Sequence, residues 1–85
     1  MKGYVYILES LKDEKQYIGS TTDVKRRLSQ HFSGQVRSTL YRRPLRLKYV
    51  LEYNDIKKAR IMEKKFKKSH DLLLKELRKR KMIGV

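Results

Sequence analysis

A chain of 85 residues makes one small domain with a thin core, because a chain this short buries only ~60–65% of the surface it exposes when unfolded. Its 23 Lys and Arg residues outnumber 9 Asp and Glu residues, giving a formal net charge of +14 at pH 7. The absence of cysteine excludes disulfides and thiolate zinc sites, and no apolar run approaches the ~18 residues of a membrane span.

Two short tyrosine-bearing segments near the N-terminus predict a β-hairpin. Aromatic and β-branched residues fill the segments 1–9 and 16–20, and a charged connection separates them. Because side chains alternate along a strand, the hairpin can set Tyr6 and Tyr17 side by side, with Gly19 leaving a gap where a backbone or a ligand can approach. Cross-strand packing is the simpler explanation of the two tyrosines.

The next segment predicts a helix that starts near Asp23 and stops at Gly34. Thr22 or Asp23 suits the N-cap, and glycine suits the C-terminal stop. At 100° per residue the buried stripe consists of Val24, Leu28 and Phe32. Arg27 and His31 lie one turn apart along its edge, where the helix meets the sheet. A snorkelling arginine and a hydrogen-bonded boundary histidine are the structural alternatives to a functional pair.

A basic loop and a third strand follow this helix. Residues 35–43 have little periodicity and are rich in Arg, Ser and Thr, and Pro44 closes the segment. Residues 45–53 then alternate in polarity, which predicts a strand with one apolar face. That face consists of Leu47, Tyr49, Leu51 and Tyr53.

The C-terminal third predicts helical structure. Asn54 or Asp55 caps a helix to about Lys68, whose apolar arc of Ile56, Ala59, Met62 and Phe66 includes Glu63. A carboxylate there is costly unless it is paired, so Glu63 forms a salt bridge or serves as a metal ligand or acid–base group. A last helix starts near Ser69, and one bent helix over 55–81 is the alternative. Residues 82–85 are expected to fray or to pack on an edge.

These elements define the expected architecture. The fold class is α+β, a small three-stranded antiparallel sheet flanked by helices, in the order β-β-α-β-α with a possible extra C-terminal helix. Residues 1–85 form a single domain.

The spacing of polar residues across these elements resembles the GIY-YIG nuclease family, and within it the small stand-alone bacterial proteins grouped as UPF0213. Tyr6 precedes Tyr17 by eleven residues, and Arg27 follows ten residues later. The motifs are Tyr17-Ile18-Gly19, Arg27-Leu28, His31, and Ala59-Arg60 leading to Glu63 and Lys64-Lys65, and the resemblance covers essentially the whole chain. The family's first motif is Gly-Ile-Tyr, where this chain has Tyr4-Val5-Tyr6. Many members carry a late asparagine, and this chain has none after Asn54.

The resemblance implies a metal-dependent phosphodiesterase with catalytic residues Tyr6, Tyr17, Arg27, His31 and Glu63. By similarity, Glu63 holds one weakly bound Mg²⁺ or Mn²⁺, and Arg27 grips the scissile phosphate. Tyr6 orients or deprotonates the attacking water, Tyr17 hydrogen-bonds the same network, and His31 positions water or phosphate. The products carry a 5′ phosphate and a 3′ hydroxyl. The five side chains are expected to converge around one phosphate-sized space, with the carboxyl of Glu63 on the same side of the sheet as the two phenols.

The strong positive charge predicts a polyanionic partner, with nucleic acid first, an anionic membrane as its competitor, and a merely soluble surface as the simplest explanation. We expect a monomeric, cytoplasmic endonuclease without a signal peptide that acts on DNA rather than RNA, either structure-selectively or with low specificity, and that uses a protein partner for targeting. The alternatives are a non-catalytic basic nucleic-acid-binding module and a ribosome- or partner-bound protein. The predicted nucleic-acid contacts are Lys25, Arg26, Arg37, Arg42, Arg43, Lys64 and Lys67.

Overall fold

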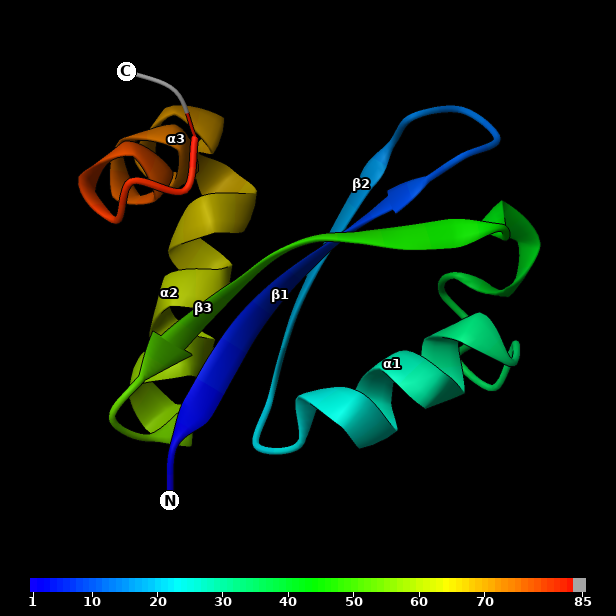
Figure 1. Cartoon of the computed structure of the whole chain (residues 1–85), viewed down its shortest axis with the longest axis horizontal. Coiled ribbons are helices and arrows are strands. Elements are labelled where there is room, and N and C mark those ends of the chain that lie inside the picture. Colours follow the sequence, from blue (N-terminus) through cyan, green and yellow to red (C-terminus); the bar gives the residue numbers. More distant parts are fainter. Residues whose placement is uncertain (84–85) are drawn as a thin grey trace.

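A three-stranded antiparallel sheet forms the centre of the fold, with strand order β2-β1-β3 (Figure 1). The computed structural model describes residues 1–83. In chain order the elements are β1 (Gly3–Ser10), β2 (Gln16–Thr21), α1 (Val24–Phe32), the 3₁₀ turn η1 (Leu40–Arg42), β3 (Leu45–Tyr53), α2 (Ile56–Lys68) and α3 (His70–Lys79). The predicted fold class and element order are confirmed, and the optional C-terminal helix is present.

The two faces of the sheet carry different layers. Helices α2 and α3 cover one face, and α1 packs on the other (Figure 1). The hydrophobic core lies on the first face, where Val5, Ile7 and Leu51 of the sheet are fully buried against Phe66 of α2 and Leu73 of α3. Because β1 is the central strand and is covered on both sides, it reads as an unbroken apolar run from Tyr4 to Leu8 rather than as a polar–apolar alternation.

A β-bulge changes the predicted apolar face of β3. Tyr49 pairs with Ile7, but Leu47 pairs with Leu8, so one extra residue of β3 is accommodated between the two pairs. Since Ile7 and Leu8 point to opposite faces, Leu47 faces away from the core that Tyr49 and Leu51 help to form. The sequence-based assignment of Leu47 to that face was therefore wrong, because simple alternation cannot detect an inserted residue.

Helix α1 also differs from its predicted packing. Its N-cap and its end are as expected: the Asp23 side chain accepts from the Arg26 N–H, and Gly34 has φ 85° just after the helix. However, the fully buried residue of this helix is His31, and Phe32 is 45% exposed. The apolar stripe predicted for this helix did not include His31, because α1 docks on the sheet through hydrogen bonds of its polar edge.

Ser69 separates the two C-terminal helices. The Asp55 side chain caps α2 by accepting from the Lys58 N–H, and Ser69 then has extended backbone angles that interrupt the helix. The Ser69 hydroxyl caps α3 by accepting from the Leu72 N–H. Two helices are therefore present rather than one bent helix. Ile83 packs against the core, and residues 84–85 of the predicted C-terminal edge lie outside the described part of the chain. Within residues 1–83 no helix is long and apolar enough to cross a bilayer.

The bulge predicts unequal costs for two leucine truncations in β3. Leu51→Ala should lower the free energy of unfolding by about 2–5 kcal/mol, because it leaves a cavity in a fully buried position. Leu47→Ala should lower it by about 1 kcal/mol or less, because Leu47 is 40% exposed. Urea unfolding of both variants measures the difference, and equal losses would contradict the proposed register.

Candidate active site

The phenol of Tyr6 lies directly over Gly19 on the neighbouring strand. The two residues are cross-strand partners in the β1–β2 ladder, and Tyr6 is 1% exposed. A Cβ atom added at Gly19 would overlap the Oη and Cζ atoms of Tyr6. The gap expected beside the tyrosines is thus filled by the Tyr6 ring itself, so Gly19 is required for packing and does not leave an open ligand space.

His31 connects this phenol to the loop after α1. Its Nε2 lies 2.9 Å from Tyr6 Oη, and its Nδ1 lies 2.8 Å from Thr39 Oγ1. The Thr39 hydroxyl donates to the Val36 carbonyl, so it accepts from His31 Nδ1–H. This arrangement leaves Nε2 free to accept the Tyr6 hydroxyl proton. Sequence reasoning missed Thr39, because nothing in a loop sequence indicates that one of its hydroxyls is buried.

Burial controls the ionisation of both groups. It raises the pKa of Tyr6 to about 12, against the opposing effect of a hydrogen bond from Arg27. Burial, with a further contribution from the Arg27 charge, lowers the pKa of His31 to about 4. At neutral pH both side chains are therefore uncharged, and the proton between them stays on the phenol.

Arg27 places a permanent positive charge beside the phenol. Its Nε donates to Tyr6 Oη over 3.2 Å, and its Nη1 donates to Gln30 Oε1 over 3.1 Å. The guanidinium borders a polar hollow of about 200 Å³ between the end of β2 and α1, which Thr22 and Arg26 also line. Asp23 lines the same hollow, and its carboxylate accepts from the Arg26 N–H. Two guanidinium groups against one carboxylate leave the hollow positively charged, which suits a phosphate.

Tyr17 completes an aromatic cluster at the free edge of the sheet. Its ring centroid lies 6.3 Å from that of Tyr6 and 5.0 Å from that of His31. Tyr6 and Tyr17 are therefore neighbours on one face, as the hairpin pattern predicts, although their register is diagonal because Tyr17 pairs with Leu8. Four of the five candidate catalytic side chains, Tyr6, Tyr17, Arg27 and His31, thus form one cluster.

Glu63 reaches the site from the other side of the sheet. Its Oε1 accepts from the hydroxyl of Ser20, which lies on the α2 face because Ser20 pairs with Val5. The expectation that this carboxyl shares a side with the two phenols is therefore wrong, and so is the expectation that all five predicted catalytic side chains converge on one face of the sheet. The reason is that α2 packs on the opposite face from α1, so Glu63 approaches along the free edge of β2.

Lys67 connects the two sides of this edge. Its Nζ lies 2.7 Å from Glu63 Oε2 and 6.0 Å from the centroid of the Tyr17 ring. The salt bridge predicted as one alternative for Glu63 is thus present, and it lies at the edge of the sheet where the phenol cluster also lies. Ser20 directly follows the motif residue Gly19, but nothing in the sequence indicates its contact with Glu63. Lys67 lies four residues after Glu63, a spacing at which a helix brings an acid and a base together, although it was predicted as a nucleic-acid contact and not as this partner.

The residues at Glu63 suit one weakly held divalent cation. Within residues 1–83 no three His, Cys, Asp or Glu side chains lie close enough to hold a metal together. A single carboxylate is compatible with Mg²⁺, which keeps most of its waters. Both oxygens of Glu63 already have partners, since Oε1 accepts from Ser20 and Oε2 pairs with the Lys67 ammonium, so a cation would have to displace Lys67.

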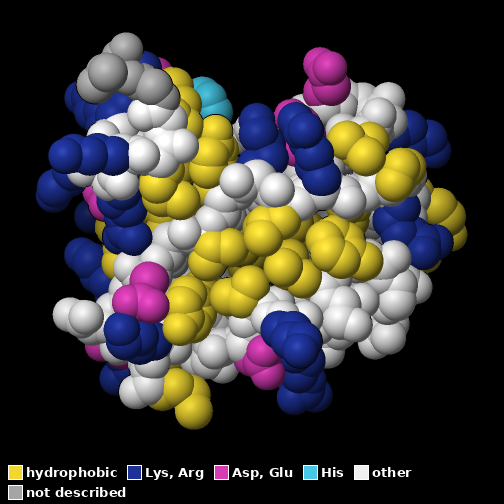
Figure 2. Space-filling view, viewed as in Figure 1, with side chains coloured by type: hydrophobic (Ala, Val, Ile, Leu, Met, Phe, Trp, Pro, Cys, Tyr) yellow, Lys and Arg dark blue, Asp and Glu magenta, His cyan; other side chains and the backbone are white. Residues whose placement is uncertain are grey.

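The seven predicted nucleic-acid contacts are all exposed: Lys25, Arg26, Arg37, Arg42, Arg43, Lys64 and Lys67. Apart from Lys67, none of them forms an ion pair with a carboxylate in the part of the chain that the structure describes. Lys and Arg side chains lie on both sides of the molecule, with a band of hydrophobic side chains between them (Figure 2). Positive charge is thus free to meet a polyanion.

Comparison with known proteins gives consistent matches. Residues 2–77 match the family model described as the GIY-YIG catalytic domain. UPF0213 proteins from Streptococcus pyogenes serotypes M3 and M5 are each 40% identical over 68 residues, which cover 79% of this chain and 73% of theirs. The solution NMR structure of a UPF0213 protein from Bacillus halodurans is 37% identical, with a TM-score of 0.54, and the match covers 91% of this chain and 82% of that one.

The contact between Tyr6 and Gly19 predicts a steric penalty. Gly19→Ala should lower the free energy of unfolding by about 1–3 kcal/mol, because the new methyl group forces the phenol away from His31 and Arg27. Thermal or urea unfolding measures this loss. In a Tyr6→Leu background the same substitution should cost much less, and an equal cost in both backgrounds would show that the phenol is not the clashing group.

The buried histidine predicts a loss of stability in mild acid. Because the pKa of His31 is about 4 in the folded state and 6.5 ordinarily, the unfolded chain binds more protons between these values, so stability falls as the pH drops through this window. The free energy of unfolding should fall by about 2 kcal/mol between pH 7 and pH 5. His31→Gln, which retains His70, should lose most of this dependence. An NMR titration of His31 with a midpoint near 6.5 would refute the prediction.

Proposed function

Because this chain belongs to the GIY-YIG catalytic domain family, a nuclease family, we propose that it is an endonuclease that hydrolyses phosphodiester bonds of DNA with the help of one divalent cation. The observation that carries the proposal is the contact of Tyr6 with both Arg27 and His31, next to a phosphate-sized hollow. Arg27 supplies positive charge, and Tyr6 supplies a hydroxyl that is held in a fixed orientation. Hydrolysis of a phosphodiester by water requires both.

Arg27 and Tyr6 act together on the phosphate. The Arg27 guanidinium neutralises charge that develops on the non-bridging oxygens while it keeps its hydrogen bond to the phenol. Tyr6 holds the attacking water through its oxygen, and His31 Nε2 keeps the phenol hydrogen aligned. With a pKa of about 12 the phenol stays protonated at neutral pH and cannot take a proton from water, so Tyr6 orients the water; a bound divalent cation would add positive field that lowers the pKa of the phenol.

Glu63 would hold the cation at the free edge of β2. A divalent ion bound there, Mg²⁺ or Mn²⁺, would stabilise the leaving oxygen and lower the pKa of a bound water. The Ser20 hydroxyl orients the carboxylate by donating to Oε1, and the Lys67 ammonium pairs with Oε2, so a cation would compete with Lys67 for this carboxylate. A Lys67 ammonium released in this way would be free to contact the nucleic-acid backbone.

A non-catalytic nucleic-acid-binding module is the second candidate. It is favoured by the neutral states of Tyr6 and His31 and by Tyr4, which occupies the position of the first motif's glycine. Such a module would bind duplex DNA through its exposed cations alone. Neutralising ~5 phosphates gives a log–log salt slope of about −4.5, with no cleavage at any salt concentration.

The proposal predicts metal-dependent cleavage that requires the site residues. With Mg²⁺ or Mn²⁺, the wild type should cut plasmid and branched DNA to leave a 5′ phosphate and a 3′ hydroxyl. Glu63→Gln and Tyr6→Phe should each reduce the rate by at least about 100-fold, because each removes a group that acts in the transition state. Gel assays with end-labelled DNA measure the rates and the termini.

Glu14→Gln is the matched control, since it neutralises an exposed carboxylate in the β1–β2 turn and should cut like the wild type. Binding of Mn²⁺, followed by electron paramagnetic resonance, should be lost in Glu63→Gln and retained in Glu14→Gln. Absence of cleavage by the wild type, together with salt-dependent binding, would favour the non-catalytic module.

A further inference from the structure

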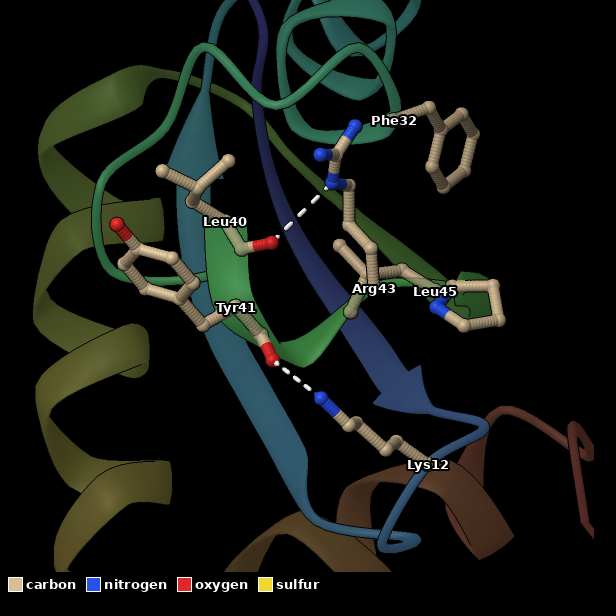
Figure 3. Close-up of a pocket in the computed structure, with 7 residues that line it drawn as sticks. Lys12, Phe32, Leu40, Tyr41, Arg43 and Leu45 are labelled. Carbon is tan, nitrogen blue, oxygen red and sulfur yellow. Dashed lines mark hydrogen bonds between the residues drawn. The ribbon is translucent and has the colours of Figure 1, made fainter.

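A second hollow, of about 590 Å³, lies between the end of α1, the 3₁₀ turn η1 and the β1–β2 connection (Figure 3). It is separate from the phosphate-sized hollow beside Arg27, with which it shares no residue. Its lining combines aromatic and apolar side chains (Phe32, Leu40, Tyr41) with two cationic ones (Lys12, Arg43). No acidic side chain lines it, so the hollow suits an anionic ligand that also has a flat apolar part.

Two aromatic rings in this region are left in solvent. Tyr41 is 81% exposed and Phe32 is 45% exposed. Figure 3 shows the Arg43 side chain between Phe32 and Leu40, with the Tyr41 ring on the other side of Leu40. Lys12 Nζ donates to the Tyr41 carbonyl over 3.4 Å, and neither Lys12 nor Arg43 forms an ion pair with a carboxylate within residues 1–83. Exposed rings beside cations without carboxylate partners are the arrangement that stacks nucleobases and holds the adjoining phosphates.

The walls of the hollow are fixed before any ligand binds. The buried Ser10 hydroxyl donates to the Arg42 carbonyl over 2.7 Å, and the Leu11 N–H donates to the Pro44 carbonyl over 2.8 Å. Arg43 Nε donates to the Leu40 carbonyl over 3.2 Å. Binding therefore requires little ordering of the loop that carries Tyr41, which favours affinity.

The hollow is also connected to the catalytic cluster. Phe32 directly follows His31 in α1, and the loop that carries Tyr41 starts at Thr39, which hydrogen-bonds to His31 Nδ1. The two hollows border opposite ends of α1, since Thr22 and Arg27 line one and Phe32 lines the other, so a strand that contacts both would run along this helix. Lys12 and Arg43 would bind the phosphates of such a strand, so the rings of Phe32 and Tyr41 would contact its bases.

We propose that this hollow binds an unpaired nucleotide of the substrate strand, with its base stacked on Tyr41 and its phosphate held by Arg43 and Lys12. The inference rests on the proposed nucleic-acid substrate and specifies it further: the strand is single-stranded where it leaves the catalytic cluster, as at a flap, a branch or an overhang. An anionic membrane would also attract the cations, but it gives no preference for an unpaired base.

Binding without cleavage tests the proposal. Fluorescence anisotropy in EDTA compares a short single-stranded DNA, the RNA of the same sequence and the blunt DNA duplex. Tyr41→Ala should weaken binding of the single strands by about 5- to 150-fold, the range for loss of one base–aromatic stack, and should change duplex binding by less than about 2-fold. Tyr41→Phe should bind like the wild type, because the ring stacks without its hydroxyl.

Two further variants separate stacking from charge. Arg43→Ala should reduce the magnitude of the log–log salt slope on single-stranded DNA by about 0.7, whereas Tyr41→Ala should leave the slope unchanged. Ile61→Ala, which removes an apolar side chain that is 50% exposed on α2, should have no effect. Vesicles of anionic lipid should compete with single-stranded DNA no better than with the duplex.

The inference is overturned if Tyr41→Ala weakens single-strand and duplex binding equally, if Tyr41→Phe loses as much as Tyr41→Ala, or if Ile61→Ala matches either. Because the measurement uses EDTA, its outcome is independent of catalysis. If Tyr41 stacks on single strands but the protein does not cleave with metal, only the proposed activity is refuted. If the protein cleaves but shows no single-strand preference that depends on Tyr41, only this inference is refuted. A larger effect on RNA than on DNA would retain the site and reassign the strand to RNA.

Discussion

The packing of the Tyr6 phenol on Gly19 is the constraint on which the site depends. A buried hydroxyl needs hydrogen-bonding partners, and the absence of a side chain at position 19 places this one where Arg27 and His31 can both reach it. The same contact determines how α1 docks, because the helix buries a histidine instead of an apolar stripe. On this face of the sheet, the contacts that pack α1 are therefore the same contacts that assemble the site.

The free edge of β2 is where the two faces of the sheet meet. A wider sheet would separate Glu63 from the phenols, but β2 has no further neighbour, so groups from both faces lie along one rim. Ser20 and Tyr17, three residues apart on this strand, contact the carboxylate side and the phenol side respectively, and Lys67 lies between them. An edge site of this kind leaves room for an extended polymer, which suits a nucleic-acid strand better than a small enclosed ligand.

The proposed nucleic-acid strand would meet a basic surface and the second hollow. Exposed cations lie on α1, η1 and α2, and most have no carboxylate partner within residues 1–83. Electrostatic attraction of this type holds any nucleic acid, whereas exposed aromatic rings select unpaired bases. Under the proposed function, binding of nucleic acid would explain why so small a chain carries more positive charge than solubility requires.

The sequence by itself determined the α+β class and the element order, because strand and helix periodicity and helix caps are local properties. The motif spacing also predicted that Tyr6, Tyr17, Arg27 and His31 lie together, and the fold brings these four side chains into one cluster. Tertiary structure alone decided what depends on how elements meet. The bulge in β3 moved Leu47 to the other face, docking of α1 exposed Phe32, and the opposite packing of α2 brought Glu63 round the strand edge. Thr39 and Ser20 joined the site through hydrogen bonds that span the chain, and such contacts have no period or spacing by which a sequence could reveal them.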